Sequence, residues 1–162
     1  MALKTGGAQG RMKTDSNLPL SNGVTIFMVA AQNVSGLSPD GQGVFLEYAL
    51  DSEIKRNGST TDVLSTLNSD NVGSSSITDG LFCTIVVKTD GVDSTLYVNG
   101  IMVGGGTAFS APTEQPLYIF QNHLNANTGN KMIASIICYT KLVDDTERGQ
   151  LETYLQETYN HY

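Results

Sequence analysis

The segment from Lys131 to Tyr159 reads KMIASIICYTKLVDDTERGQLETYLQETY and decides the fold class. Its first part, residues 132–139, is an apolar run with several β-branched side chains, which is typical of a buried strand. Asp144 followed by Glu147 has the spacing of a capping box, in which each side chain accepts a hydrogen bond from the other residue's backbone N–H. The segment therefore predicts a strand, a turn and then one helix, from about Asp144 to Tyr159.

The predicted helix carries one apolar stripe, and the chain before it has the pattern of strands. Leu151, Tyr154, Leu155 and Tyr159 recur at helical spacing, so we expect them to be buried. Short apolar runs predict strands at residues 24–31, 44–50, 62–67, 81–89, 94–103, 117–121 and 132–140. The strand at 94–103 is expected to bend at Asn99-Gly100, a dipeptide that favours a tight turn. Turn-forming residues predict polar loops at 33–43, 68–76 and 122–130, and a flexible break at 104–106. This order predicts an all-β fold, a two-sheet antiparallel jelly-roll sandwich with one C-terminal α-helix.

The composition limits the class of protein. A chain of 162 residues with 17 glycines is one domain by length and suits many turns between short strands. Its net charge of −7 argues against binding to nucleic acid. No apolar run approaches the roughly 20 residues that span a bilayer. The first residues lack the apolar segment of a secretory signal, so we expect synthesis in a reducing cytosol. Cys83 and Cys138 lie in apolar runs, which predicts two buried, unlinked thiols.

The first 20 residues differ from the rest in composition. They contain three of the chain's nine basic residues and little apolar periodicity, so we expect an extended N-terminal arm, residues 1–20, before a sandwich domain, residues 21–162. A disordered leader is the alternative. As an arm, this segment would bind an acidic partner surface, such as a neighbouring subunit. The residues that we expect to make that contact are Leu3, Lys4, Arg11, Met12 and Lys13.

Several motifs resemble one fold family. They are Val143-Asp144-Asp145-Thr146-Glu147-Arg148 with the Tyr-Leu helix after it, Leu81 to Val87 before Asp90-Gly91, Leu96-Tyr97-Val98-Asn99-Gly100, and Pro116 to Ile119. These motifs are similar to the closing segment and paired strands of concanavalin A-like (laminin-G-like) lectin/glucanase domains. The resemblance covers about residues 23 to 160 and implies the same sandwich fold.

The resemblance also implies a class of function. Single domains of this kind look like structural proteins of tailed phages, which implies a non-catalytic decoration or fibre module on the virion surface. Its expected partners are a capsid or tail protein, further copies of itself as a homo-oligomer, and a polysaccharide of the host surface. A free carbohydrate-binding lectin or adhesin is the first alternative, and a glycoside hydrolase is the second.

Three carboxylates were candidates for glycoside hydrolysis. Glucanases of this family place catalytic carboxylates on alternate residues of one strand, as Glu-x-Asp-x-Glu, because alternate side chains share a face. Here Glu47, Asp51 and Glu53 break that spacing, and Ala49 stands where a carboxylate is expected. We therefore expect no catalytic residues and interpret these carboxylates as a solvated strand end.

A polar loop is the candidate for glycan contact. Amide side chains both donate and accept hydrogen bonds, so they can pair with sugar hydroxyls. The loop candidates are Asn122, His123, Asn125 and Asn127, and the candidates for an aromatic platform are Tyr48, Tyr97 and Tyr118. No metal site is predicted from the spacing of ligands. Calcium stays open as a cofactor, with Asp90, Asp93 and Asn122 as candidate ligands.

Overall fold

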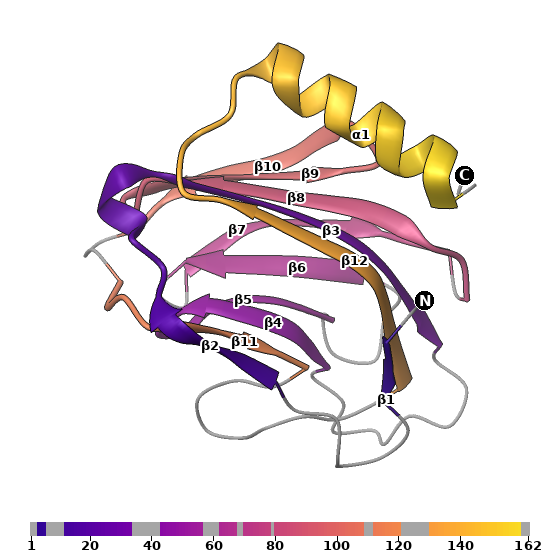
Figure 1. Ribbon diagram of the computed structural model, residues 1–162, viewed down its shortest axis with the longest axis horizontal. Helices are drawn as coiled ribbons and strands as arrows, with labels where there is room; N and C mark the ends of the chain where they lie inside the picture. Colours follow the sequence, from indigo (N-terminus) through magenta and orange to yellow (C-terminus); the bar gives the residue numbers. More distant parts are fainter. Residues whose placement is uncertain are drawn as a thin grey trace.

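The computed structural model describes residues 3–5, 12–33, 43–56, 62–67, 70–78, 80–108, 112–120 and 130–159. These residues form two stacked antiparallel sheets with one helix on the outside (Figure 1). Sheet A has the order β1 (Leu3–Thr5), β12 (Asn130–Tyr139), β3 (Val24–Asn33), β8 (Cys83–Thr89), β9 (Asp93–Val98) and β10 (Ile101–Thr107). Sheet B has the order β2 (Met12–Asn17), β11 (Pro116–Ile119), β4 (Val44–Ala49), β5 (Ser52–Arg56), β6 (Asp62–Leu67) and β7 (Asp70–Ser76). A short 3₁₀ turn, η1 (Leu20–Asn22), joins β2 to β3. The predicted fold class is confirmed.

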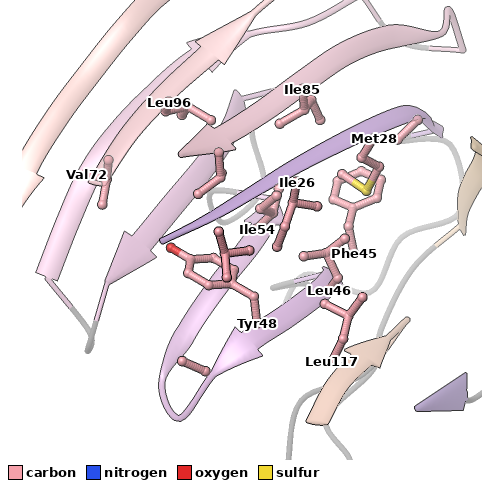
Figure 2. Packing of buried hydrophobic residues seen from close by; sticks show 14 of the residues in the cluster. Ile26, Met28, Phe45, Leu46, Tyr48, Ile54, Val72, Ile85, Leu96 and Leu117 are labelled. Carbon is pink, nitrogen blue, oxygen red and sulfur yellow. The ribbon is translucent and has the colours of Figure 1, made fainter. Parts of the chain in front are cut away.

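The main core lies between the two sheets. Figure 2 shows Ile26 and Met28 of sheet A close to Phe45, Tyr48 and Ile54 of sheet B. β3 is apolar on both faces because it is covered on both: its inner side chains enter this core, and its outer ones lie under the helix. A strand with both faces covered gives the continuous apolar run seen in the sequence.

Helix α1 (Asp145–Tyr159) packs on the outer face of sheet A, against Phe27, Val29 and Val86 (Figure 1). Its predicted capping box is present. The Glu147 backbone N–H donates to Asp144 Oδ1 at 2.8 Å, and the Asp144 N–H donates to Glu147 Oε2 at 3.4 Å. Within the described residues, no helix is long and apolar enough to cross a membrane.

The buried stripe of α1 differs from the prediction at one position. Leu155 is buried, and Leu151 and Tyr159 pack against the same apolar cluster, as expected. Tyr154 is 57% exposed, so its predicted burial is wrong. Glu152 is buried instead, because it pairs with Arg148, whose guanidinium lies 4.1 Å from the centre of the Tyr97 ring. Burial raises the pKa of the Glu152 carboxyl.

Two segments that were predicted to be a loop and a flexible break form paired strands. Residues 70–76 are β7, not a loop. The hairpin β9–β10 turns at Asn99-Gly100, as predicted. The predicted flexible break at 104–106 lies inside β10. A Cβ added to Gly73 would lie 2.7 Å from the Cα of Gly104, so only glycines allow β7 and β10 to approach this closely. The two sheets therefore meet along this side of the sandwich.

The N-terminal segment contributes a strand to each sheet. Residues 3–5 and 12–17 are extended, as expected, but they pair with β12 and β11 of the same chain.

Both cysteines are free, which agrees with the prediction. Cys83 is buried, whereas Cys138 is exposed, so its predicted burial is wrong. Cys138 lies in the half of β12 beyond its pairing with β1, where none of the other described strands adjoins the edge.

Candidate functional site

Four polar side chains form a row across sheet B, on the face turned away from the core. We call Lys13, Tyr118, Glu47 and Glu53 the polar row. The outward direction of Tyr118 and Glu53 follows from strand alternation, because Leu117 on β11 and Ile54 on β5 beside them are core residues (Figure 2). Lys13 and Glu47 share that face because each is directly opposite Tyr118 in the neighbouring strand.

The strand register brings the four residues side by side. Lys13 is directly opposite Tyr118, Tyr118 is opposite Glu47, and Glu47 is opposite Glu53. Directly opposed residues in antiparallel strands have Cβ atoms about 5 Å apart. The row therefore runs at right angles to four neighbouring strands, from the edge strand β2 to β5.

The two carboxylates of the row are buried, so the expectation of a solvated strand end is wrong for them. Glu47 is 0% exposed and Glu53 is 7% exposed. They lie on separate strands because the chain turns at Asp51, whose φ is +55°. Glu47 Oε1 accepts a hydrogen bond from the Asp51 backbone N–H at 3.1 Å, and Glu53 Oε2 pairs with Lys55 Nζ at 2.9 Å. Each carboxylate thus holds a structural contact.

Lys13 and Tyr118 are the accessible members of the polar row. The Lys13 side chain is exposed, and Tyr118 is half-buried. β2 is held beside β11 by the Leu117 backbone N–H, which donates to Thr14 Oγ1 at 3.0 Å. Within the described part of the chain, no ion pair joins Lys13 to Asp15 or to any other carboxylate. An ammonium group and an aromatic ring are therefore adjacent at this edge of sheet B.

The other two tyrosines considered as aromatic platforms are occupied. Tyr48 is fully buried, and its hydroxyl donates to the Thr66 carbonyl at 2.6 Å. Burial raises the pKa of Tyr48 to about 12. A platform role for Tyr48 is therefore ruled out by its position in the core. Tyr97 is half-buried, and the guanidinium of Arg148 covers its ring.

The candidate calcium ligands Asp90 and Asp93 serve a tight turn between β8 and β9. Asp90 Oδ1 accepts from the backbone N–H groups of Val92 and Asp93 at 2.9 and 2.8 Å, and these bonds hold its pKa below the usual value. Asp93 Oδ1 accepts from the Thr107 hydroxyl at 2.5 Å. Among the residues that the structure describes, no group of three or more acidic, histidine or cysteine side chains is placed to hold a metal ion.

A groove lies next to this turn, at the end of the sandwich where β3 begins. It has a volume of about 360 Å³ and is lined by Leu20, Ser21, Asp90, Gly91, Val92, Pro112 and Glu114. Glu114 Oε1 accepts from the Ser21 backbone N–H at 3.3 Å, which ties one wall to the other. The groove shares no lining residue with the polar row.

The remaining predicted site residues fall largely outside the described part of the chain. Asn122, His123, Asn125, Asn127 and Arg11 lie outside it, and only the backbone of Leu3 and Lys4 is described. Met12 and Lys13 are in β2. The glycan contacts predicted for the 122–130 loop and the partner contacts predicted for the N-terminal segment stay predictions.

Sequence reasoning missed the polar row as a unit. It placed Lys13 in an arm and put Glu47 and Glu53 on one strand. The alternation of apolar and polar residues, as in Leu117-Tyr118 and Glu53-Ile54, indicates which side chains face outward. The register that brings the four strands into line cannot be inferred from the sequence of any one strand.

No protein-family model matches the sequence, and no curated protein matches it. Solved structures resemble it in shape. One is the binding domain of botulinum neurotoxin DC in complex with rat synaptotagmin II, with TM-score 0.70, 13% identity, and coverage of 96% of this chain and 42% of that one. The same domain in complex with SialylT has TM-score 0.66, 12% identity, and coverage of 96% and 42%.

A sialidase is also similar. Trypanosoma rangeli sialidase in complex with 2,3-difluorosialic acid, as a covalent intermediate, has TM-score 0.64, 13% identity, and coverage of 82% of this chain and 23% of that one. The chain thus spans less than half the length of the neurotoxin domain and about a quarter of the sialidase. At this level of identity the likeness concerns the fold, a lectin-like jelly-roll sandwich.

Proposed function

We propose that this chain is a non-catalytic carbohydrate-binding module whose binding surface is the polar row. The observation that carries the proposal is the position of Tyr118, which is half-buried between Lys13 and Glu47 on the outward face of sheet B. A tyrosine ring offers a flat apolar surface with a polar tip, and carbohydrate sites combine such a surface with a few placed polar groups.

Two of the similar structures support the choice of ligand class. The neurotoxin binding domain was solved in complex with SialylT, and the sialidase with a difluorinated sialic acid. A sandwich of this shape therefore occurs in proteins that bind carbohydrate. The position of the site proposed here is taken from this chain's own residues.

A direct test compares two tyrosine variants. Tyr118→Ala removes the proposed platform, whereas Tyr154→Ala removes a tyrosine that is exposed on α1. We expect Tyr118→Ala to reduce binding on a glycan array by about 2 kcal/mol or more, roughly thirtyfold. Tyr154→Ala should bind like the wild type, and both should keep the wild-type circular dichroism spectrum. Equal glycan binding by Tyr118→Ala and the wild type would refute the site.

Glycoside hydrolysis is the second candidate, because Glu47 and Glu53 are directly opposed. Retaining glycosidases need two carboxyl groups about 5 Å apart, which this register allows. Their burial and their contacts with Asp51 and Lys55 support a structural role instead. We expect no release of reducing sugar from polysaccharides. Release that disappears in Glu47→Gln and Glu53→Gln would establish the enzyme.

From the sequence resemblance we also propose that the module belongs to the surface of a phage-like particle. The basic N-terminal segment supports this, since it suits contact with an acidic capsid, tail or sister subunit. Immunogold labelling of purified particles tests the placement. We expect label on the particle, and protein found only in the soluble lysate would contradict it.

A further inference from the structure

The accessible charge beside Tyr118 is positive, although the chain as a whole carries −7. Lys13 is exposed and directly opposite Tyr118. On the other side of the ring, Glu47 is fully buried, and the charge of Glu53 is balanced by Lys55 at 2.9 Å. A ligand on the ring therefore meets one ammonium group and no exposed carboxylate within the polar row.

The two neighbours of Tyr118 in the polar row differ in charge and exposure, since Lys13 is exposed and Glu47 is buried. Neighbouring strands are about 4.8 Å apart, so Lys13 and Glu47, which flank Tyr118 on β2 and β4, are separated by about 10 Å. A negative group on a ligand is attracted towards β2, where the exposed ammonium of Lys13 lies. Asp15, two residues along β2, is the other charged residue of this strand and is also exposed, and no ion pair between described residues links it to Lys13. Lys13 is the charged residue directly opposite the ring of Tyr118.

Resting on the proposed function, we infer that the polar row selects acidic glycans, with the sugar ring on Tyr118 and its carboxylate paired with Lys13 Nζ. The hydrogen bonds of a charged pair are stronger than those of neutral groups, so the carboxylate contributes selectivity beyond the stacking of the ring. The carboxylate lies over β2, next to the ring of Tyr118 on β11. Lys13 is the residue that determines specificity, and Tyr118 is the general platform.

The test uses matched ligands. An array carries oligosaccharides that end in uronic or sialic acid, next to the same oligosaccharides with the carboxyl converted to its methyl ester. We expect the wild type to bind the acids about tenfold more tightly than the esters at low salt. Lys13→Gln should bind acid and ester alike, at the level of the wild type with the ester. Tyr118→Ala should lose both.

A matched control separates a local effect from a change in total charge. Lys141→Gln also removes one ammonium, from a half-exposed lysine that pairs with Glu147 near the start of α1. It should keep the preference for acids. If the wild type binds acid and ester equally, or if Lys13→Gln keeps the preference, the inference is wrong while the glycan site stands. If the wild type binds none of the glycans, the proposed function and the inference both fall.

Discussion

At the scale of single residues, Leu155 is the apolar side chain that attaches α1 to sheet A. It is 1% exposed and lies among Phe27, Val29 and Val86. Leu155→Ala removes buried contacts and leaves a cavity, so we expect it to lower the free energy of unfolding by about 2–5 kcal/mol. Urea unfolding measures this. Tyr154→Ala, one position earlier and exposed, is the control and should change stability by less than about 0.5 kcal/mol. A similar loss of stability in both variants would contradict the observed orientation of α1, in which Leu155 faces sheet A and Tyr154 faces outward.

Cys83 and Cys138 also differ in burial, since Cys83 is buried and Cys138 is exposed. Burial raises the pKa of Cys83 to about 12, and partial burial also raises that of Cys138. The thiolate is the reactive form, so both react slowly at neutral pH and faster as the pH rises. We expect a thiol reagent to modify Cys138 first in the native protein, and Cys83 only after unfolding. Titration of denatured, unreduced protein should find two free thiols, and finding none would mean that they are linked.

At the scale of elements, the contact between β7 and β10 depends on glycine. Gly73→Ala would place a methyl group 2.7 Å from the Cα of Gly104, and the backbone must move to admit it. We expect a loss of about 1–3 kcal/mol in the free energy of unfolding. Gly149→Ala is the matched control, because the added methyl in α1 meets nothing within 4 Å and should stabilise the helix by about 0.5–1 kcal/mol. If both variants respond alike, the close approach does not matter for stability.

The elements that could be predicted are those whose signal is local. The cap at Asp144, the apolar run of β3 and the Asn99-Gly100 turn each predict their structure from a few neighbouring residues. β7 could not be predicted in this way, because its serines and glycine have low strand propensity and pairing with β6 decides its conformation. The hydrophobic pattern predicted a buried Tyr154, but Tyr154 is exposed and Glu152 is buried. The pattern could not show this, because the burial of Glu152 depends on its ion pair with Arg148.

At the scale of the whole molecule, the sequence predicts the sandwich more completely than the site. The sandwich follows from many strands that each carry some signal. The polar row needs the order β2–β11–β4–β5, which joins residues more than 100 positions apart, such as Lys13 and Tyr118. No local pattern in a single sequence carries that pairing. The candidate site could therefore be assembled only after the register was known.

The last prediction concerns the first seventeen residues, which the sequence indicated as a removable arm. In the structure they supply β1 to sheet A and β2 to sheet B. Deleting residues 1–17 would leave β11 with β4 as its one neighbour and would uncover the paired edge of β12. Bare edge strands invite pairing with other chains, and the sandwich loses backbone hydrogen bonds in both sheets. We therefore expect the truncated protein to unfold at lower urea concentration and to self-associate in size-exclusion chromatography.

A charge variant of the full chain distinguishes the contribution of strands β1 and β2 from that of the basic charge in the N-terminal segment. Lys4→Gln with Arg11→Gln keeps the backbone of β1 and β2 and removes two of the nine basic residues. It should unfold like the wild type, because the pairing of these strands rests on backbone hydrogen bonds. If it nevertheless fails to join particles, the charge serves a partner, as the sequence indicated. If the truncated protein is as stable and monomeric as the wild type, β1 and β2 contribute nothing to the sandwich and the segment is an arm after all.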